Sequence, residues 1–149
     1  MKVLLVILHA DSTRGGAELY TVRLFHKLLE IGHDVFMGAA TFEASIDAAR
    51  RIALDHSGLT RVGRYRRFLK SLDRHLATTN YDIVHAMLPV NRCDVYHPHA
   101  GIESVTIRSA SLPSRLGNRR RALMAKLEAE LLTAGAMTGC PARGVCEAI

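Results

Sequence analysis

Two adjacent glycines, Gly15 and Gly16, open a helical segment soon after an apolar run over residues 1–8. The run is continuous rather than alternating, which is typical of a buried strand in a parallel sheet. Open α/β sheets bind ligands where such a strand passes into its helix, and amides at a helix N-terminus attract anions. The two glycines therefore predict either a loop that approaches a pyrophosphate or sugar hydroxyls, or a tight turn that needs positive φ angles.

Histidines gather after two further predicted strands, over residues 81–86 and 94–97. The candidate site residues there are His85, Asn91, Asp94, His97 and His99, with Cys93 beside them. Histidine can hold a hydroxyl or move a proton, although any single one is more often a hydrogen-bonded loop residue. A metal site from His97, His99 and Asp94 would lack a clear fourth ligand, so no metal is expected.

Helices and strands alternate along the rest of the chain. Helical spacing of apolar residues predicts a helix over residues 17–31 that ends at Gly32, a basic amphipathic helix over 64–76, and a long helix over 115–134. A short strand is predicted over 33–38, whereas residues 42–52 have helical composition without a clear pattern. A strand is due after residue 135, but the stretch there is short and broken by glycine and proline. This order predicts an α/β fold, a Rossmann-like parallel sheet with helices on both faces.

Composition limits the function classes. The 149 residues are 48% hydrophobic, enough for one domain, and the three cysteines form no C-x-x-C pair, which favours a reducing cytoplasm. The first turn lacks G-x-G-x-x-G and no P-loop pattern occurs, so a nicotinamide oxidoreductase is disfavoured. A net charge of +6 suits an anionic partner. Because aromatic residues make up only 5%, the basic helices favour an anionic membrane surface over nucleic acid.

Several segments together resemble a known enzyme family. Residues 1–38, with Gly15-Gly16-Ala17-Glu18 opening the helix, and residues 81–86 are similar to the start of family 4 glycosyltransferases. Residues 91–101, followed by an arginine-rich helix, resemble more narrowly the lipopolysaccharide core glucosyltransferase I branch. The resemblance covers nearly the whole chain. It implies that residues 1–149 are the N-terminal, acceptor-side half of a GT-B fold, and that the C-terminal donor-binding domain with its paired-glutamate motif is absent.

The resemblance also implies an activity: transfer of a sugar, with retention and without metal or cofactor, from a nucleotide sugar to a glycan or lipopolysaccharide-type acceptor. Gly15 and Gly16 match the loop that reaches the donor phosphates, and Asp94 matches an aspartate toward the acceptor. His99 best matches the histidine near the transferred sugar, although His97 takes that place in another alignment. The expected location is the cytoplasm or the inner face of the membrane.

The chain alone is expected to be inactive, because the donor pocket of such a fold is shared between two domains. The alternatives are a non-catalytic binding module or remnant, and one half of a split enzyme that needs a partner chain.

Overall fold

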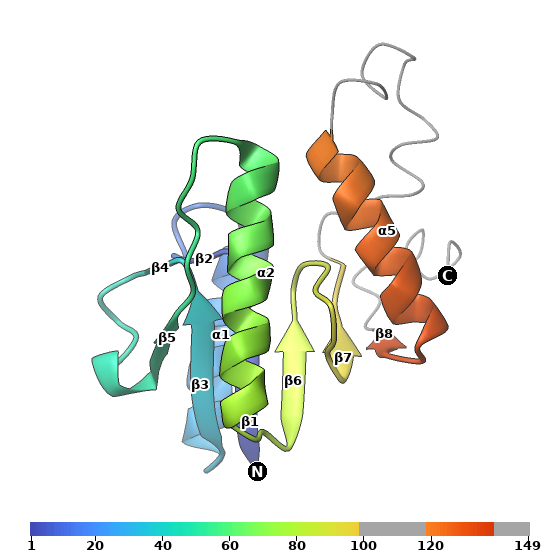
Figure 1. The fold of residues 1–149 in the computed structure, drawn as a ribbon. Helices are drawn as coiled ribbons and strands as arrows, with labels where there is room; N and C mark the ends of the chain where they lie inside the picture. Colours follow the sequence, from blue (N-terminus) through green and yellow to red (C-terminus); the bar gives the residue numbers. More distant parts are fainter. Residues whose placement is uncertain (99–118, 139–149) are drawn as a thin grey trace.

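The computed structural model describes residues 1–98 and 119–138, which form a parallel sheet with helices on both faces (Figure 1). Six strands pair in the order β5 (Arg51–Ala53), β3 (Asp34–Ala39), β1 (Lys2–Val6), β6 (Ile83–Ala86), β7 (Val95–Tyr96) and β8 (Met137–Thr138). Every neighbouring pair is parallel. Beyond β1 and β3, the two-residue strands β2 (His9–Ala10) and β4 (Thr41–Phe42) form a second parallel pair.

The central strand β1 is buried on both sides. Val3 and Leu5 belong to the core that includes Phe25 of helix α1 (Gly16–Glu30). Leu4 and Val6 belong to the other core, with residues of α2 (Arg61–Thr78) and α5 (Arg119–Thr133). Because two opposite faces need apolar side chains, the strand reads as an unbroken apolar run. The prediction of an α/β fold with helices on both faces is confirmed.

Helix α1 ends where the sequence predicts. Gly32 has a φ of 87°, and its N–H donates to the Leu29 carbonyl at 3.0 Å. The next amide, of His33, donates to the Leu28 carbonyl at 3.0 Å. This pair of bonds is a Schellman ending, which glycine favours because it has no Cβ to clash in the left-handed region. It turns the chain directly into β3.

The helical composition of residues 42–52 does not produce an α-helix. The segment contains β4, a short 3-10 turn η1 (Ala48–Arg50) and the start of β5. The Arg51 guanidinium donates to the Ile46 and Glu43 carbonyls, at 2.8 and 3.2 Å for Nε and Nη2 respectively. A side chain thus satisfies loop carbonyls that helical amides would otherwise bond, and the following residues extend along β3.

The last strand exists although glycine and proline follow it. Met137 of β8 pairs with Val95 of β7, and its N–H donates to the Asp94 carbonyl at 2.9 Å. The interrupting Gly139 and Pro141, and the predicted start of the long helix at residue 115, lie outside the described residues.

Candidate functional site

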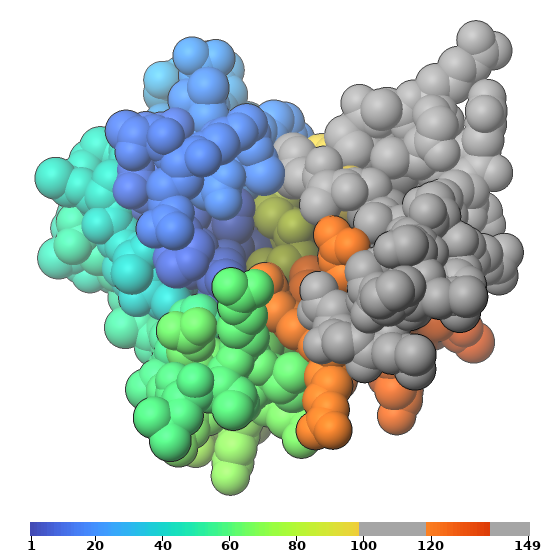
Figure 2. Space-filling model, turned by 90° about the horizontal axis from the view of Figure 1, so that it is seen from above, coloured from blue at the N-terminus to red at the C-terminus, as the bar shows by residue number. Residues whose placement is uncertain are grey.

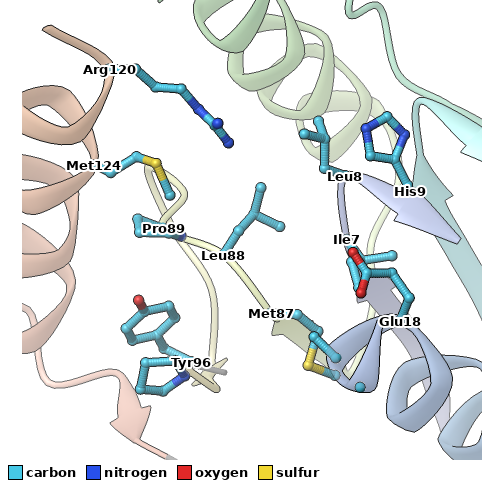
Figure 3. Close-up of a pocket in the computed structure, with 13 residues that line it drawn as sticks. Ile7, Leu8, His9, Glu18, Met87, Leu88, Pro89, Tyr96, Arg120 and Met124 are labelled. Carbon is cyan, nitrogen blue, oxygen red and sulfur yellow. The ribbon is translucent and has the colours of Figure 1, made fainter. Parts of the chain in front are cut away.

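A cavity of about 350 Å³ opens at the carboxyl edge of the sheet. Seen from above that edge, the segment after β6 lies recessed between the N-terminal segment and the start of α5 (Figure 2). The N-terminus of α1 forms one wall, Leu88 and Pro89 after β6 line the middle, and Arg120 and Met124 of α5 form the opposite wall (Figure 3). Carboxyl edges of parallel sheets are where α/β folds bind ligands.

The α1 wall presents bare backbone. Gly16, Ala17 and Glu18 line the cavity, and their amides belong to the first turn of the helix, which has no side-chain cap. Neither Gly15 nor Gly16 lies in the left-handed region that favours glycine, and the backbone of Gly15 is fully extended at φ 176°. A Cβ on Gly16 would meet no atom within 4 Å. The alternative of a turn that needs positive φ angles is therefore wrong, and the described fold gives no steric reason for glycine at position 16.

The loop leading to these glycines is held by local hydrogen bonds. The Thr13 hydroxyl donates to Asp11 Oδ1 at 2.6 Å, and the Ser12 N–H donates to Glu43 Oε2 at 2.6 Å. Hydrogen bonds from Thr13 lower the pKa of Asp11, and those from Ser45 and Ser12 lower the pKa of Glu43. The end of α1 is thus fixed at the cavity before any ligand arrives.

The Glu18 carboxylate covers part of this helix end. Its Oε2 lies 2.9 Å from the position that a Cβ on Gly15 would take. Figure 3 shows the carboxylate inside the cavity, below His9. A negative charge near a helix N-terminus is electrostatically favourable. An anion at the same amides would have to displace it.

The α5 wall was not found from the sequence. Tyr96 of β7 lines the cavity, and its hydroxyl donates to the buried carboxylate of Glu128 at 2.6 Å. Arg120 and Met124 lie two turns and one turn earlier on the same face of α5 as Glu128. The four-residue spacing was the available signal, but only the packed structure shows that this face borders a cavity.

Arginines lie near two histidines at the mouth of the cavity. Burial, followed by Arg14 and His56, lowers the pKa of His9. Burial, followed by Arg64 and Arg120, lowers the pKa of His56. These two rings meet edge to face, with centroids 6.1 Å apart. Both rings are therefore more readily neutral than a free histidine, and the nearby arginines Arg14, Arg64 and Arg120 favour an anion at the mouth.

The predicted histidines lie on the sheet and outside the cavity lining. His85 is level with Leu5 of β1, on the side of the sheet that α1 covers. Its ring stacks on His97 at 5.8 Å, and His97 meets Tyr20 of α1 edge to face at 5.1 Å. Burial lowers the pKa of His97. His99 lies outside the described residues.

The structure does not bring Asp94 and Asn91 to this cavity. Asp94 lines a pocket of about 220 Å³ toward the amino ends of β6 and β7, where its Oδ2 accepts the Val84 N–H at 2.7 Å. Asn91 donates from Nδ2 to Asp73 of α2 at 2.5 Å. Burial raises the pKa of the neighbouring Cys93 thiol to about 12.

In the part of the chain that the structure describes, no three His, Cys, Asp or Glu side chains are grouped to hold a metal ion. Over residues 1–98 and 119–138, no helix has the length and apolar character needed to cross a membrane.

Comparison with known proteins supports the fold. No protein-family model matches the sequence, and no curated protein matches it either. Among solved structures, the chain is similar to WaaG, a glycosyltransferase involved in lipopolysaccharide biosynthesis, with a TM-score of 0.79 and 19% sequence identity. The match covers 93% of this chain and 37% of that chain. The likeness shows that the chain has the Rossmann-like architecture expected of half of a GT-B fold.

Proposed function

We propose that the chain is the N-terminal, acceptor-side half of a retaining glycosyltransferase of the family 4 type. It would help transfer a sugar from a nucleotide-sugar donor to a glycan or lipopolysaccharide-type acceptor. A second, donor-binding domain or a partner chain would complete the site. The observation that carries the proposal is the cavity at the carboxyl edge of the sheet, bordered by the uncapped N-terminus of α1. The fold shared with WaaG supports the same reaction class.

The donor phosphates would lie against the backbone of Gly15 and Gly16. Amides of the first helical turn and the helix dipole stabilise an anion, and a missing side chain lets it approach. A Cβ at Gly16 would point into open space, so a larger residue there would fill the space of the ligand and leave the fold undisturbed. Binding requires the Glu18 carboxylate to turn away from Gly15. In its new position the carboxylate could accept a hydrogen bond from a sugar hydroxyl.

We assign His99 to the transferred sugar, with His97 as the alternative. His97 follows β7 at the carboxyl edge, and the next residue, Pro98, lines the cavity. Asp94, His85 and Asn91 belong to the acceptor side in this proposal, although the described contacts of Asp94 and Asn91 are with neighbouring structural groups.

Membrane contact belongs to the same proposal. Exposed basic side chains line α2, and they are Arg61, Arg66, Arg67, Lys70 and Arg74. Such a face attracts anionic lipid, which would hold the enzyme at the inner surface of the membrane beside a lipid-linked acceptor.

Product formation tests the proposal. The purified chain is incubated with a panel of nucleotide sugars and glycan or lipid acceptors, with and without a separately expressed donor-binding domain, and products are detected by mass spectrometry. Transfer that appears only with the second domain supports the half-enzyme. Multiple turnovers by the chain alone contradict it, and ligand binding without transfer in either case favours the non-catalytic binding module.

A further inference from the structure

The two walls of the carboxyl-edge cavity carry opposite charges. The Glu18 carboxylate projects from α1, and the Arg120 guanidinium projects from the start of α5 toward the same space (Figure 3). Among the described residues, neither group forms a hydrogen bond or an ion pair with another side chain. A cavity with unpaired charges at opposite walls can orient a ligand as well as hold it.

Arg120 packs on a ring that is itself held in place. Its guanidinium carbon lies 5.5 Å from the centroid of the Tyr65 ring of α2. Tyr65 is itself fully buried and donates its hydroxyl to the Pro89 carbonyl at 2.5 Å. Two turns further along α5, the buried bond between Tyr96 and Glu128 fixes the helix to the sheet. The guanidinium is therefore held over the cavity mouth, where less side-chain entropy is lost on binding.

Within residues 1–98 and 119–138, no acid is bonded to the Arg120 guanidinium. His9 and His56 lie within its electrostatic reach. Arg64 is near His56, and its buried Nε has no hydrogen-bond partner within the described residues. The acids nearby are Asp55, which bonds the Ser57 N–H, and Glu18 on the far wall. A planar guanidinium that is not bonded to an acid is free to bind phosphate through two parallel hydrogen bonds.

We propose that Arg120 binds a phosphate group on the acceptor, so that the cavity takes a phosphorylated sugar. The inference rests on the proposed function, which gives the opposite wall, with Gly16, to the donor phosphates. A phosphate on α5 then belongs to the second substrate. Leu88 and Tyr96, with Met124 of the α5 wall, offer an apolar surface for the sugar ring. A volume of about 350 Å³ is close to the lower end of ordinary ligand pockets.

Substitutions on α5 test the assignment with two different probes. Glucose 6-phosphate and glucose serve as acceptor-like probes, and uridine diphosphate serves as the donor-like probe, each titrated into the full chain and followed by NMR chemical shifts. Arg120→Gln should weaken glucose 6-phosphate binding by about tenfold or more, because it removes a charge-assisted pair of hydrogen bonds. The affinity of Arg120→Lys should lie between those of wild type and Arg120→Gln, because lysine keeps the charge but lacks the planar guanidinium.

Arg119→Gln is the matched control, because it removes the same charge from an exposed neighbour on α5. It should change glucose 6-phosphate affinity by less than about twofold, because Arg119 is exposed to solvent and does not line the cavity. Thermal melts show whether each variant is folded. If all variants melt like wild type, a glucose 6-phosphate affinity that falls from wild type to Arg120→Lys to Arg120→Gln reports binding by Arg120.

Three results would overturn the proposal. They are equal binding of glucose and glucose 6-phosphate, wild-type binding by Arg120→Gln, and an Arg120→Gln defect confined to uridine diphosphate, which would give the phosphate to the donor. Wild-type chain that binds glucose 6-phosphate through Arg120 but no uridine diphosphate would contradict the donor site of the proposed function. The Arg120 site would stand in that case.

Discussion

The two edges of the sheet use polar side chains differently. At the amino edge, the Asp94 carboxylate accepts the Val84 N–H at 2.7 Å and the Asp82 carboxylate accepts the Lys2 N–H at 2.6 Å. At the carboxyl edge, Arg120 and Glu18 face a cavity, and neither is paired with another described side chain. Bonded carboxylates hold strand ends in place, whereas unpaired charges at a cavity remain available to a ligand. Changes at the first edge should alter stability, and changes at the second should alter binding.

The largest effect is expected at His99, in a protein that contains both halves. His99→Ala should lower turnover by roughly a hundredfold or more if it holds or moves a proton at the transferred sugar. His97→Ala should instead lower the melting temperature, because His97 packs against His85 and Tyr20. Steady-state kinetics and thermal melts of both variants separate the roles. If His97→Ala is inactive and His99→Ala is active, His97 is the histidine at the transferred sugar and the assignment moves by two residues.

Bulk at the carboxyl edge should affect binding without affecting the fold. Gly16→Val should weaken uridine diphosphate binding by about tenfold or more, because the side chain would occupy the place of the phosphate. Its melting temperature should stay close to wild type, since a Cβ there meets no atom within 4 Å. Ala77→Val adds bulk on an exposed turn of α2 and is the control. If calorimetry shows that Gly16→Val binds uridine diphosphate as tightly as wild type, the two glycines only connect the strand to the helix and do not bind the donor.

The amino edge should show the opposite behaviour. Asp94→Ala should lower the free energy of unfolding by about 1–3 kcal/mol, because it leaves the Val84 N–H without its acceptor. Asp94→Asn keeps an acceptor oxygen and should retain most of the stability. Urea unfolding of both variants gives the comparison. If Asp94→Asn is stable but loses activity in the two-domain enzyme, Asp94 acts on the acceptor and the division between the edges fails there.

The smallest effect concerns pH. Burial lowers the pKa of His9, His56 and His75 below 6.5 in the folded chain. The unfolded chain therefore binds more protons near that pH, so stability should fall as the pH drops below 6.5. Unfolding measured between pH 7 and pH 5 checks the sign, where no loss of stability would contradict these shifts.

Added phosphate should change the pKa of His9 at the carboxyl edge but not that of His75 at the amino edge. A phosphate bound at Arg120 would add negative charge near His9, whose other charged neighbours are Arg14, His56 and Glu18. The apparent pKa of His9 should then rise, whereas that of His75, which faces Lys2 at the amino edge, should not. NMR titration of the histidine rings with and without phosphate measures both, and an equal response would indicate general ionic screening.

Much of the fold could be read from local pattern. The apolar run of β1, the helix that ends at Gly32 and the basic face of α2 follow from spacing and from one conformational requirement of glycine. Residues 42–52 could not be read this way, because a guanidinium from within the segment replaces helical hydrogen bonds and β3 supplies the pairing for β5. Composition does not report either contact.

The sequence by itself determined the parallel sheet, its covering helices and the glycine pair at the end of α1, since each depends on residues close along the chain. Only the tertiary structure decided which residues share the cavity. Arg120 is more than one hundred positions from Gly16 in the sequence, yet both line the same cavity. Asp94 and His97 are close in sequence, yet Asp94 lies at the amino edge of the sheet and His97 at the carboxyl edge. The physical reason is that the two ends of a strand lie at opposite edges of the sheet, so the residues before and after a short strand are separated. The parallel strands and their helices bring residues that are distant in sequence to the same edge.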